Sequence, residues 1–420
     1  MVSLNKRILL ITYAFPPNQA PESYLSAKSL SYISTFDVDV LTINQENLGI
    51  PSDISLDNYI KKNFKNIYRI KKQLWLNAAL FHWLRFLLPF PDRFVILNKL
   101  IVKKAFEINI EKYSLIISWS QWHSIHLAAN CIKKSFPYIP WVVHMSDPWS
   151  DNPFLPNIPG FSFIQKFLEK KVLKNADLIN FTTQDTLDLV MNKYPKGWTA
   201  KTCVIPHAFD PVLYETCNNK FMPNHSLRII RYLGNFYGPR NPRSFALATA
   251  AIYNHNPSLF ENIQIEFIGR WIGNFKWKAE DEGVPKGLIV FRSPVTYLES
   301  LKLMSESNVL LVIDAPFENS VFFPSKLIDY IGANRPILAL TPNGCCANVL
   351  KEIGGIIVNP TSVSSIKSGL EVALVLINKS SMDPPNKNLS EKYSAIEISC
   401  LYEKHFNELI DTLSSQRIYE

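Results

Sequence analysis

Short apolar runs alternate with amphipathic segments along the first half of the chain. We expect buried strands at 7–15, 38–43, 115–119, 141–145, 178–183 and 203–207. Between the runs, apolar residues recur with helical spacing, which predicts helices over 22–33, 98–110, 123–134 and 163–175. Strands that alternate with helices are typical of a parallel sheet covered by helices. The pattern therefore predicts an N-terminal Rossmann-like α/β domain over residues 1–207.

The same alternation restarts after an interruption at 207–226, where Asn, Pro and His gather and the periodicity is lost. Beyond it we expect strands at 228–234, 263–269, 288–291, 309–314, 336–340 and 355–359, with helices at 243–254, 297–306 and 326–333. This pattern predicts a second Rossmann-like domain over 208–390, followed by a C-terminal helix over 391–420. Two such domains in succession predict a cleft between the carboxyl ends of their strands, where these folds bind ligands.

Composition fits a folded protein of two domains. The chain has 420 residues, of which 47% are hydrophobic and 19% are charged, which is typical of a folded chain with a large buried core. The apolar segment 74–88 contains His82 and Arg85, and it is too short to span a bilayer. We expect no signal peptide, because the first strand follows the N-terminus without a small-residue cleavage site. The six cysteines show no CxxC pair, so we expect free thiols in a cytoplasmic protein.

The net charge of +8 suits a partner that carries phosphate or an anionic membrane surface. The basic residues are scattered, and no nucleic-acid-binding motif is present, so we expect no nucleic-acid partner. The stretch 71–104 interleaves basic and aromatic residues and could lie on the inner face of the cell membrane. The alternative is an ordinary pair of helices with solvated lysines. The residues in question are Lys71, Lys72, Arg85, Arg93, Lys99, Lys103, Lys104, Trp75, Phe81, Trp83 and Phe86.

The segment 318–336 is the strongest candidate for a phosphate site. Ser325 stands where a helix is expected to begin, so free backbone N–H groups and the positive end of the helix dipole would face a ligand there. Lys326 adds a positive charge, and Asp329 could accept hydrogen bonds from sugar or ribose hydroxyls. The alternative is a plain capped helix with an exposed lysine and aspartate.

The segment 232–242 is a second candidate, because it is the first strand-to-helix turn of the second domain. Gly234 and Asn235 follow the strand, and Arg240 lies near the start of the next helix. This turn is therefore another expected site for a phosphate group. A tight turn without a ligand is the alternative.

A third candidate lies in the first domain, where the strand at 141–145 ends in polar residues. His144, Ser146 and Asp147 lie close together there, and ionisable groups at a strand's carboxyl end favour a functional site. His123 and His126 open the helix after another strand. An aspartate that caps its loop, and histidines that are packed internally, are the alternatives.

Five segments, taken in order, resemble retaining glycosyltransferases of the GT-B fold, in the group-1 or family-four class. They are ILLITYAFPP (8–17), VVHMSDPW (142–149), EKKVLKNADLINFTT (169–183), VIPHAFD (204–210) and FPSKLIDYIGANRPILAL (323–340). The resemblance implies that a sugar passes from a nucleotide diphosphate to a saccharide or lipid-linked acceptor in surface polysaccharide biosynthesis. It also implies retention of the anomeric configuration, with no metal and no cofactor.

The resemblance also implies roles for individual residues. Arg240 and Lys326 match the basic pair that grips the donor diphosphate, and Asp329 matches the second acid of a Glu-x7-Glu motif. Asp147 matches an acid near the transferred sugar. The acceptor side would include the loop 16–22, with Pro17 and Ala20, together with His123 and His144.

Two departures from the family pattern keep other functions open. The first acid of Glu-x7-Glu falls at Val321, and Asn18-Gln19-Ala20-Pro21 replaces the usual glycines. A non-catalytic nucleotide-binding subunit is therefore one alternative. A UDP-amino-sugar epimerase of the same fold is the other.

Overall fold

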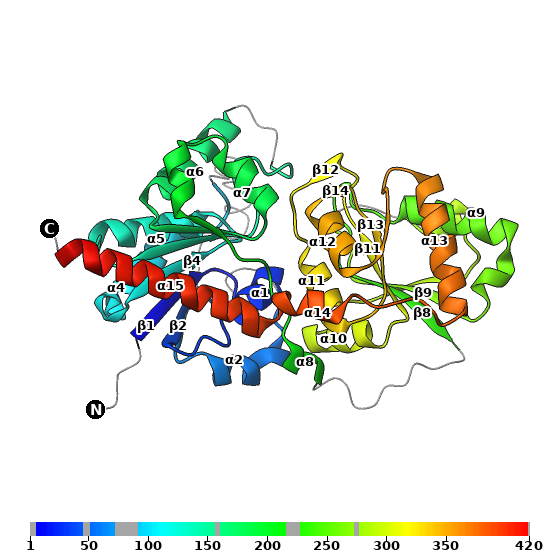
Figure 1. Ribbon diagram of the computed structural model, residues 1–420, viewed down its shortest axis with the longest axis horizontal. Coiled ribbons are helices and arrows are strands. Elements are labelled where there is room, and N and C mark those ends of the chain that lie inside the picture. Colours follow the sequence, from blue (N-terminus) through cyan, green and yellow to red (C-terminus); the bar gives the residue numbers. More distant parts are fainter. Residues whose placement is uncertain are drawn as a thin grey trace. The chain divides into compact units, whose positions relative to one another are not determined.

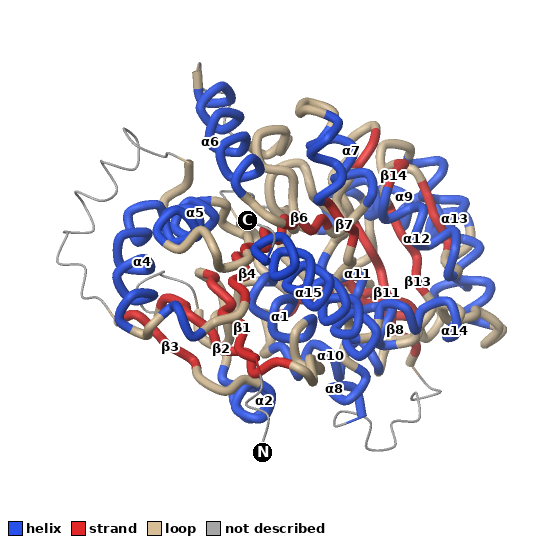
Figure 2. Tube along the Cα trace, turned by 60° about the vertical axis from the view of Figure 1, so that its left-hand side comes forward, coloured by secondary structure: helices blue, strands red, loops and turns tan. Residues whose placement is uncertain are grey.

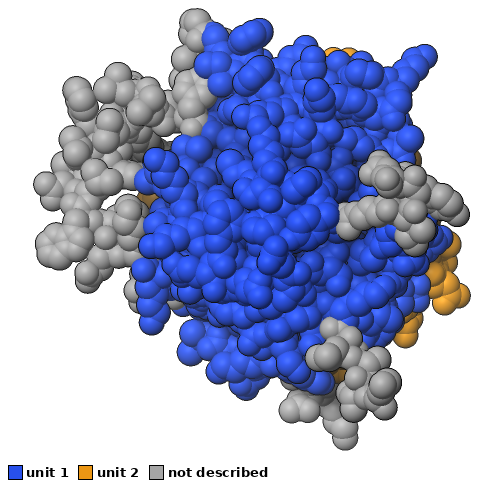
Figure 3. All heavy atoms as spheres, turned by 90° about the vertical axis from the view of Figure 1, so that its left-hand side faces the viewer, with its two compact units in different colours: residues 1–207, 395–420 blue, residues 208–394 orange. Residues whose placement is uncertain are grey.

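Two α/β units make up the part of the chain that the structure describes, which comprises residues 6–44, 51–71, 91–155, 160–215, 227–272 and 277–418. The structure is a computed structural model, drawn in Figure 1. Unit 1 comprises Met1–His207 and Ala395–Glu420, and unit 2 comprises Ala208–Ser394. Unit 1 is thus built from both ends of the chain, and it is coloured blue in Figure 3.

Unit 1 contains a seven-stranded parallel sheet in the order β3-β2-β1-β4-β5-β6-β7. Its strands are β1 (Lys6–Thr12), β2 (Phe36–Ile43), β3 (Ile67–Ile70), β4 (Leu115–Trp119), β5 (Trp141–Met145), β6 (Leu178–Phe181) and β7 (Thr202–Val204). The central strands are apolar along most of their length because helices cover both faces of the sheet. Ile8, Leu9, Leu10 and Ile11 of β1 are all fully buried.

The helices of unit 1 are α1 (Pro21–Ser29), α2 (Asp57–Asn63), α4 (Asn98–Glu107), α5 (Ser124–Ser135), α6 (Phe161–Asn175), α7 (Gln184–Met191) and α15 (Ala395–Ile418). The helix α5 packs against α4 and α6, whereas α15 packs against α1 (Figure 2). Ile398, Tyr402 and Phe406 are buried, and their spacing of four residues places them on one face of α15. The last helix of the chain therefore completes the core of the first unit.

Unit 2 contains a six-stranded parallel sheet in the order β10-β9-β8-β11-β13-β15, beside a two-stranded pair β12-β14. The strands are β8 (Arg228–Leu233), β9 (Ile263–Ile268), β10 (Ile289–Arg292), β11 (Val309–Ile313), β12 (Asn319–Ser320), β13 (Ile337–Leu340), β14 (Asn343–Gly344) and β15 (Ile356–Val358). The helices are α8 (Pro211–Glu215), α9 (Arg243–His255), α10 (Tyr297–Ser305), α11 (Ser325–Ala333), α12 (Cys345–Ile353), α13 (Val363–Asn378) and α14 (Lys387–Ser390).

Both sheets reverse their strand order at a point beside the first strand of the unit. In unit 1 the chain leaves β1 toward β2 and β3 and then returns to β4 on the other side. In unit 2 the reversal lies between β8 and β11. Loops at the carboxyl ends of the strands diverge at such a reversal, which leaves room for a ligand. The predicted fold class, two Rossmann-like α/β domains, is confirmed.

Two helix boundaries differ by four residues from the sequence prediction. The helix expected over 22–33 ends at Ser29, because the backbone N–H groups of Ser34 and Thr35 donate to the carboxylate of Glu403 on α15. These hydrogen bonds join residues that are 369 and 368 positions apart in the sequence, and they take the place of a further turn of α1. The C-terminal helix, expected from residue 391, begins at Ala395.

The pattern of apolar residues did not predict the helices α2, α7, α8, α12, α13 and α14 or the strands β3, β12 and β14. The long helix α13 contains Gly369, at which an added Cβ would lie 2.2 Å from the side chain of Val358 on β15. Glycine usually weakens a helix, so the sequence pattern gave no clear signal for α13. The close packing of α13 on the sheet nevertheless requires a glycine at this position. Among the described residues, no helix is both long and apolar enough to cross a membrane.

Candidate functional site

Lys326 lies in the first turn of α11 and reaches the end of β8. Its Nζ donates a hydrogen bond of 2.7 Å to the hydroxyl of Tyr232 and lies 3.9 Å from the centroid of that ring. A Cβ added at Gly234 would lie 2.8 Å from the same Nζ, and Gly234 has a φ of +148°. This backbone conformation favours glycine, and any side chain here would displace the ammonium from its present place. The predicted residues Gly234 and Lys326 are therefore neighbours.

Arg240 is held beside this lysine by an aspartate that the sequence analysis did not single out. The guanidinium forms an ion pair of 2.7 Å with Asp314, and it donates to the hydroxyl of Tyr237 at 2.9 Å. Oδ1 of Asp314 also accepts from its own neighbour's backbone, the N–H of Ala315, at 2.8 Å. The side chains of Arg240 and Asp314 are 12% and 4% exposed.

Asp314 follows β11 directly, so it stands on the opposite side of the strand reversal from Gly234. The polar residue at the end of the apolar run 309–313 was a usable signal, because carboxyl ends beside a reversal carry ligand-binding groups. Because the predicted strand 309–314 included Asp314, this residue was not recognised as a candidate for the site.

The surroundings of Lys326 shift the pKa of its side chain strongly. Burial lowers the pKa of Lys326 well below its usual range, the charge of Arg240 lowers it further, and Asp314 partly offsets both effects. Two cations in a place with little water disfavour each other's charge, and an anion bound between them would relieve this cost. The arrangement suits a dianionic group.

The start of α11 adds donors to the same place. Pro324 is the N-cap residue, and no side chain caps the helix. The first backbone N–H groups, including that of Ser325, thus lack the side-chain acceptor that a helix usually recruits. An oxygen of a bound phosphate group could accept hydrogen bonds from these N–H groups.

Asn235 and Asp329 hold the framework around this cluster. Oδ1 of Asn235 accepts from the backbone N–H of Arg270 at 3.0 Å, which ties the loops after β8 and β9 together. Oδ1 of Asp329 accepts from the hydroxyl of Tyr297 at 2.9 Å, which joins α11 to α10. A donor-binding role for either residue remains a prediction.

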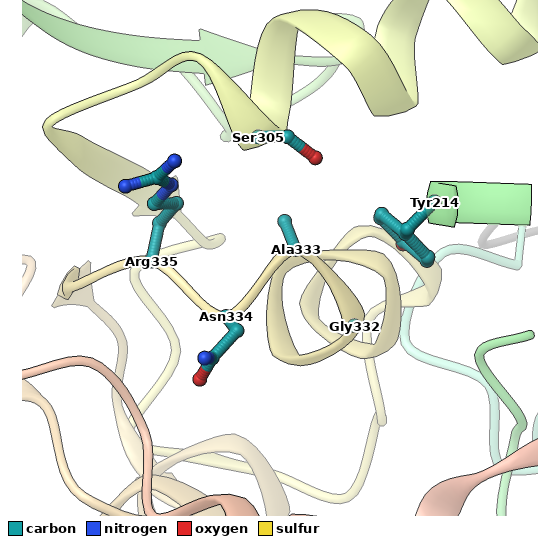
Figure 4. A pocket seen from close by; sticks show the side chains of 6 residues that line it. All are labelled: Tyr214, Ser305, Gly332, Ala333, Asn334 and Arg335. Carbon is teal, nitrogen blue, oxygen red and sulfur yellow. The ribbon is translucent and has the colours of Figure 1, made fainter. Parts of the chain in front are cut away.

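A pocket of about 300 Å³ lies at the opposite end of α11 from Lys326 (Figure 4). Its lining residues are Tyr214, Ser305, Gly332, Ala333, Asn334 and Arg335. None of the predicted site residues lines it, so we do not assign it to the cluster of Arg240 and Lys326.

In unit 1, Asp147 follows β5 and lies near a buried glutamate. Oδ2 of Asp147 accepts a hydrogen bond of 3.2 Å from Nε2 of Gln121. The glutamate is Glu22 in the first turn of α1, which is only 7% exposed. Burial, and after it the charge of Asp147, raise the pKa of Glu22 to about 8, against the hydrogen bonds from Ser146 and Trp119. The sequence analysis included Glu22 only as the end of the loop 16–22.

Of the predicted histidines of unit 1, His144 is buried and His123 is partly buried. His144 is 1% exposed and stacks on Trp119, with ring centroids 3.5 Å apart. His123 stacks on Trp149, with centroids 5.1 Å apart. Burial lowers the pKa of both rings, to about 3 for His123, so both are neutral near pH 7. We interpret both rings as packed side chains, which was the alternative left open for His123. An acceptor-side role for either residue remains a prediction.

The loop that carries Pro17 and Ala20 is fastened to the segment 51–53. The carbonyl of Pro17 accepts from the backbone N–H of Asp53 at 2.6 Å. The N–H of Ala20 donates to Oδ1 of Asn18 at 2.8 Å, just before α1 begins. These hydrogen bonds fix the conformation of the loop before α1.

The proposed membrane stretch 71–104 falls largely outside the described residues. This applies to Lys72, Trp75, Phe81, Trp83, Arg85 and Phe86. Within the described part, Lys103 is well exposed, and both it and Lys104 pair with Glu107. The guanidinium of Arg93 lies 4.6 Å from the centroid of the Phe94 ring. In the described ranges of the chain, no group of three or more His, Cys, Asp or Glu side chains could hold a metal ion.

The raised pKa of Glu22 predicts a stability that depends on pH. In the unfolded chain the carboxyl loses its proton near pH 4.5, but in the folded protein it does so near 8. The folded state therefore binds more protons between these values, and stability falls as pH rises from about 4.5 to about 8. A tenfold change in the proton affinity of a group corresponds to about 1.4 kcal/mol. Glu22→Gln, which cannot ionise, should exceed wild type in stability by a few kcal/mol at pH 8.

Urea unfolding at pH 5, 6.5, 8 and 9 checks this expectation. The control is Glu107→Gln, whose carboxyl is exposed and paired with lysines, so its effect should stay below about 1 kcal/mol. A difference between Glu22→Gln and wild type that stays constant from pH 5 to 8 would contradict the assignment.

Comparisons with known proteins show the fold. No protein-family model and no curated protein matches the chain. Among solved structures, the N-terminal domain of Candida albicans trehalose-6-phosphate phosphatase is similar, with a TM-score of 0.66 and 12% identity over 97% of this chain and 98% of that one. HepE of Anabaena in complex with UDP and glucose gives 0.64 and 12%, over 96% and 100%. A glycosyltransferase of Rickettsia africae gives 0.63 and 10%, over 97% and 99%. These likenesses span both units, and they show that the chain has the GT-B fold.

Proposed function

We propose that this chain is a glycosyltransferase that takes a sugar from a nucleotide diphosphate sugar. The observation that carries the proposal is the cluster of Arg240 and Lys326 at the strand reversal of unit 2. The two cations come from different strand-to-helix turns, and Gly234 leaves the space that the lysine needs. The similar structure of HepE holds UDP and glucose.

The chemistry required of such a site is stabilisation of the leaving diphosphate. As the bond from the sugar to the phosphate oxygen breaks, negative charge grows on that oxygen. Arg240, Lys326 and the N–H groups at the start of α11 supply positive charge and donors without any rearrangement of water. The acceptor hydroxyl would attack from the face that the leaving group occupied and pass its proton to the leaving phosphate oxygen, so the anomeric configuration is retained. The role proposed for Asp147 is to contact the transferred sugar.

The second candidate is a non-catalytic subunit that binds a nucleotide. Val321 stands where the resembled family has an acid, and the carboxylate of Asp329 is engaged by Tyr297. Donor binding without transfer to any acceptor would favour this candidate. Conversion of a UDP-amino sugar to its epimer in the absence of acceptor would favour the epimerase.

Removing either cation should weaken nucleotide binding. We expect Arg240→Ala and Lys326→Ala each to reduce the affinity for UDP by at least ~1.5 kcal/mol, the scale of a lost hydrogen bond to a charged group, or about tenfold. Arg243→Ala is the control, because Arg243 lies on the same stretch of chain but is 64% exposed and pairs with Glu282. Isothermal titration calorimetry measures all three. Equal affinities in wild type and both cation variants would rule out the site.

Transfer should proceed without a divalent metal, because two protein cations stand where a metal would neutralise the diphosphate. The experiment incubates wild type and Lys326→Ala with nucleotide sugars and a panel of saccharide and lipid-linked acceptors, with and without EDTA. We expect nuclear magnetic resonance spectra of the product to show the donor's anomeric configuration. Activity that EDTA abolishes and magnesium restores would contradict the metal-free mechanism.

We further propose that the acceptor is a saccharide or a lipid-linked saccharide in surface polysaccharide biosynthesis, met at the cytoplasmic membrane surface. This rests on the resemblance and on the basic and aromatic stretch 71–104. Each cation near an anionic surface contributes about 1 kcal/mol. Replacing four lysines by Gln (Lys71, Lys72, Lys103 and Lys104) should therefore abolish co-sedimentation with anionic vesicles at low salt. The charge-matched control replaces four other lysines by Gln, namely Lys286, Lys302, Lys387 and Lys404. If both variants co-sediment with the vesicles to the same extent, docking through the stretch 71–104 is wrong.

A further inference from the structure

A chain of buried hydrogen bonds runs from the C-terminal helix to Glu22. The hydroxyl of Tyr402 lies 2.8 Å from Nδ1 of His144, and Nε2 of His144 lies 3.1 Å from Oγ of Ser146. Oγ of Ser146 donates to Oε2 of Glu22 at 2.7 Å. Every member of the chain is less than 8% exposed. The carboxyl of Glu22 is thus oriented by a residue of α15.

The partners in this chain agree on one direction of donation. Nδ1 of His144 lies within 2.8 Å of both the Tyr402 hydroxyl and Nδ2 of Asn180, so it is an acceptor. The proton of the neutral ring is then on Nε2, which donates to Ser146. Ser146 in turn donates to Oε2 of Glu22, and so does Nε1 of Trp119 at 2.9 Å.

These two donors leave Oε1 as the oxygen that carries the proton of a neutral Glu22. Oε1 receives no hydrogen bond from any described residue, although Glu22 is only 7% exposed. Asn18, on the loop leading to Glu22, is 1% exposed, and its Nδ2 also lacks a partner in the described part of the chain.

We propose that Glu22 and Asp147 together bind two neighbouring hydroxyl groups of a saccharide in unit 1. Oε1–H of Glu22 donates to the oxygen of one hydroxyl, and the carboxylate of Asp147 accepts the hydrogen of the next. A neutral acid beside a carboxylate offers one donor and one acceptor, which is the complement of a vicinal diol. The inference rests on the proposed function, in which Asp147 contacts the transferred sugar. It adds that the same carboxylate also receives a hydroxyl of the acceptor saccharide, and that Glu22 is a binding residue.

Tyr402 is a positioning residue in this arrangement, since it acts on Glu22 through His144 and Ser146. Its loss would remove one of the two groups that hold Nδ1 of His144, the other being Asn180, and the hydrogen bond from Ser146 to Oε2 would weaken. A carboxylate with fewer donors is less stable. Tyr402→Phe should therefore move the ionisation of Glu22 to a higher pH, which a purely structural role would not do.

The charged groups around Glu22 set the expected pH dependence. Asp147, from the loop after β5, opposes ionisation of Glu22. His144, from β5 itself, is neutral because burial lowers its pKa well below the usual value. Tyr402, from α15, keeps its proton because burial raises its pKa. Binding should thus be constant below pH 7 and fall as pH rises through about 8, when Glu22 loses the proton that it donates.

The test measures binding of methyl glycosides of glucose, galactose and mannose to the full-length protein by saturation-transfer nuclear magnetic resonance between pH 6 and 9.5. Glu22→Gln keeps an N–H donor at the same place, so it should bind within about threefold of wild type and lose the fall above pH 8. Glu22→Ala and Asp147→Asn should each lose about tenfold, the scale of one hydrogen bond to a charged or buried group. Glu107→Gln is the control and should match wild type.

Affinity for UDP, measured on the same samples, separates this proposal from the proposed function. Glu22→Ala and Asp147→Asn should bind UDP as wild type does, which also shows that they are folded. If UDP binds normally but no methyl glycoside binds wild type, or if Glu22→Ala binds glycosides as wild type does, the diol site is wrong and the donor site stands. A wild-type affinity that stays constant up to pH 9.5 also overturns the proposal.

Discussion

Both sheets of this protein are parallel and covered on both faces, and this constraint decides where its polar chemistry can lie. A strand that is buried on both sides has no solvent-facing positions, so ionisable groups are costly along its length. The carboxyl end of a strand is different, because loops diverge there and backbone N–H groups of the next helix point inward. Arg240, Asp314 and Lys326 in unit 2, and Asp147 in unit 1, all lie beyond such ends.

The two units reduce the free-energy cost of burying charged groups in different ways. In unit 2 the guanidinium of Arg240 keeps its charge by pairing with Asp314, and the ammonium of Lys326 lies against the ring of Tyr232. In unit 1 the charge is removed, because Glu22 retains its proton beside Asp147. Paired groups whose environments drive their pKa values apart are a mark of functional sites. A cationic cluster suits a phosphate, whereas an acid beside a carboxylate suits neutral hydroxyl groups.

Much of the fold followed from local pattern. The strands at 115–119 and 141–145 have the predicted bounds, since each is an apolar run ended by polar residues. The helices α5, α9 and α10 lie within two residues of their predicted bounds for the same reason. The helix α13 was missed because Gly369, whose packing against Val358 is a tertiary contact, weakens the local helical signal.

The sequence by itself determined the parallel α/β class and the turns that carry Gly234, Arg240 and Lys326. Periodicity and turn residues act within a few positions of each other, so they can be seen in one dimension. The tertiary structure decided what these residues contact. Arg240 and Asp314 are 74 positions apart, Ser146 and Glu22 are 124 apart, and Tyr402 and His144 are 258 apart. No local pattern encodes such pairs, and the desolvation that keeps Glu22 protonated exists only when the chain has closed around it.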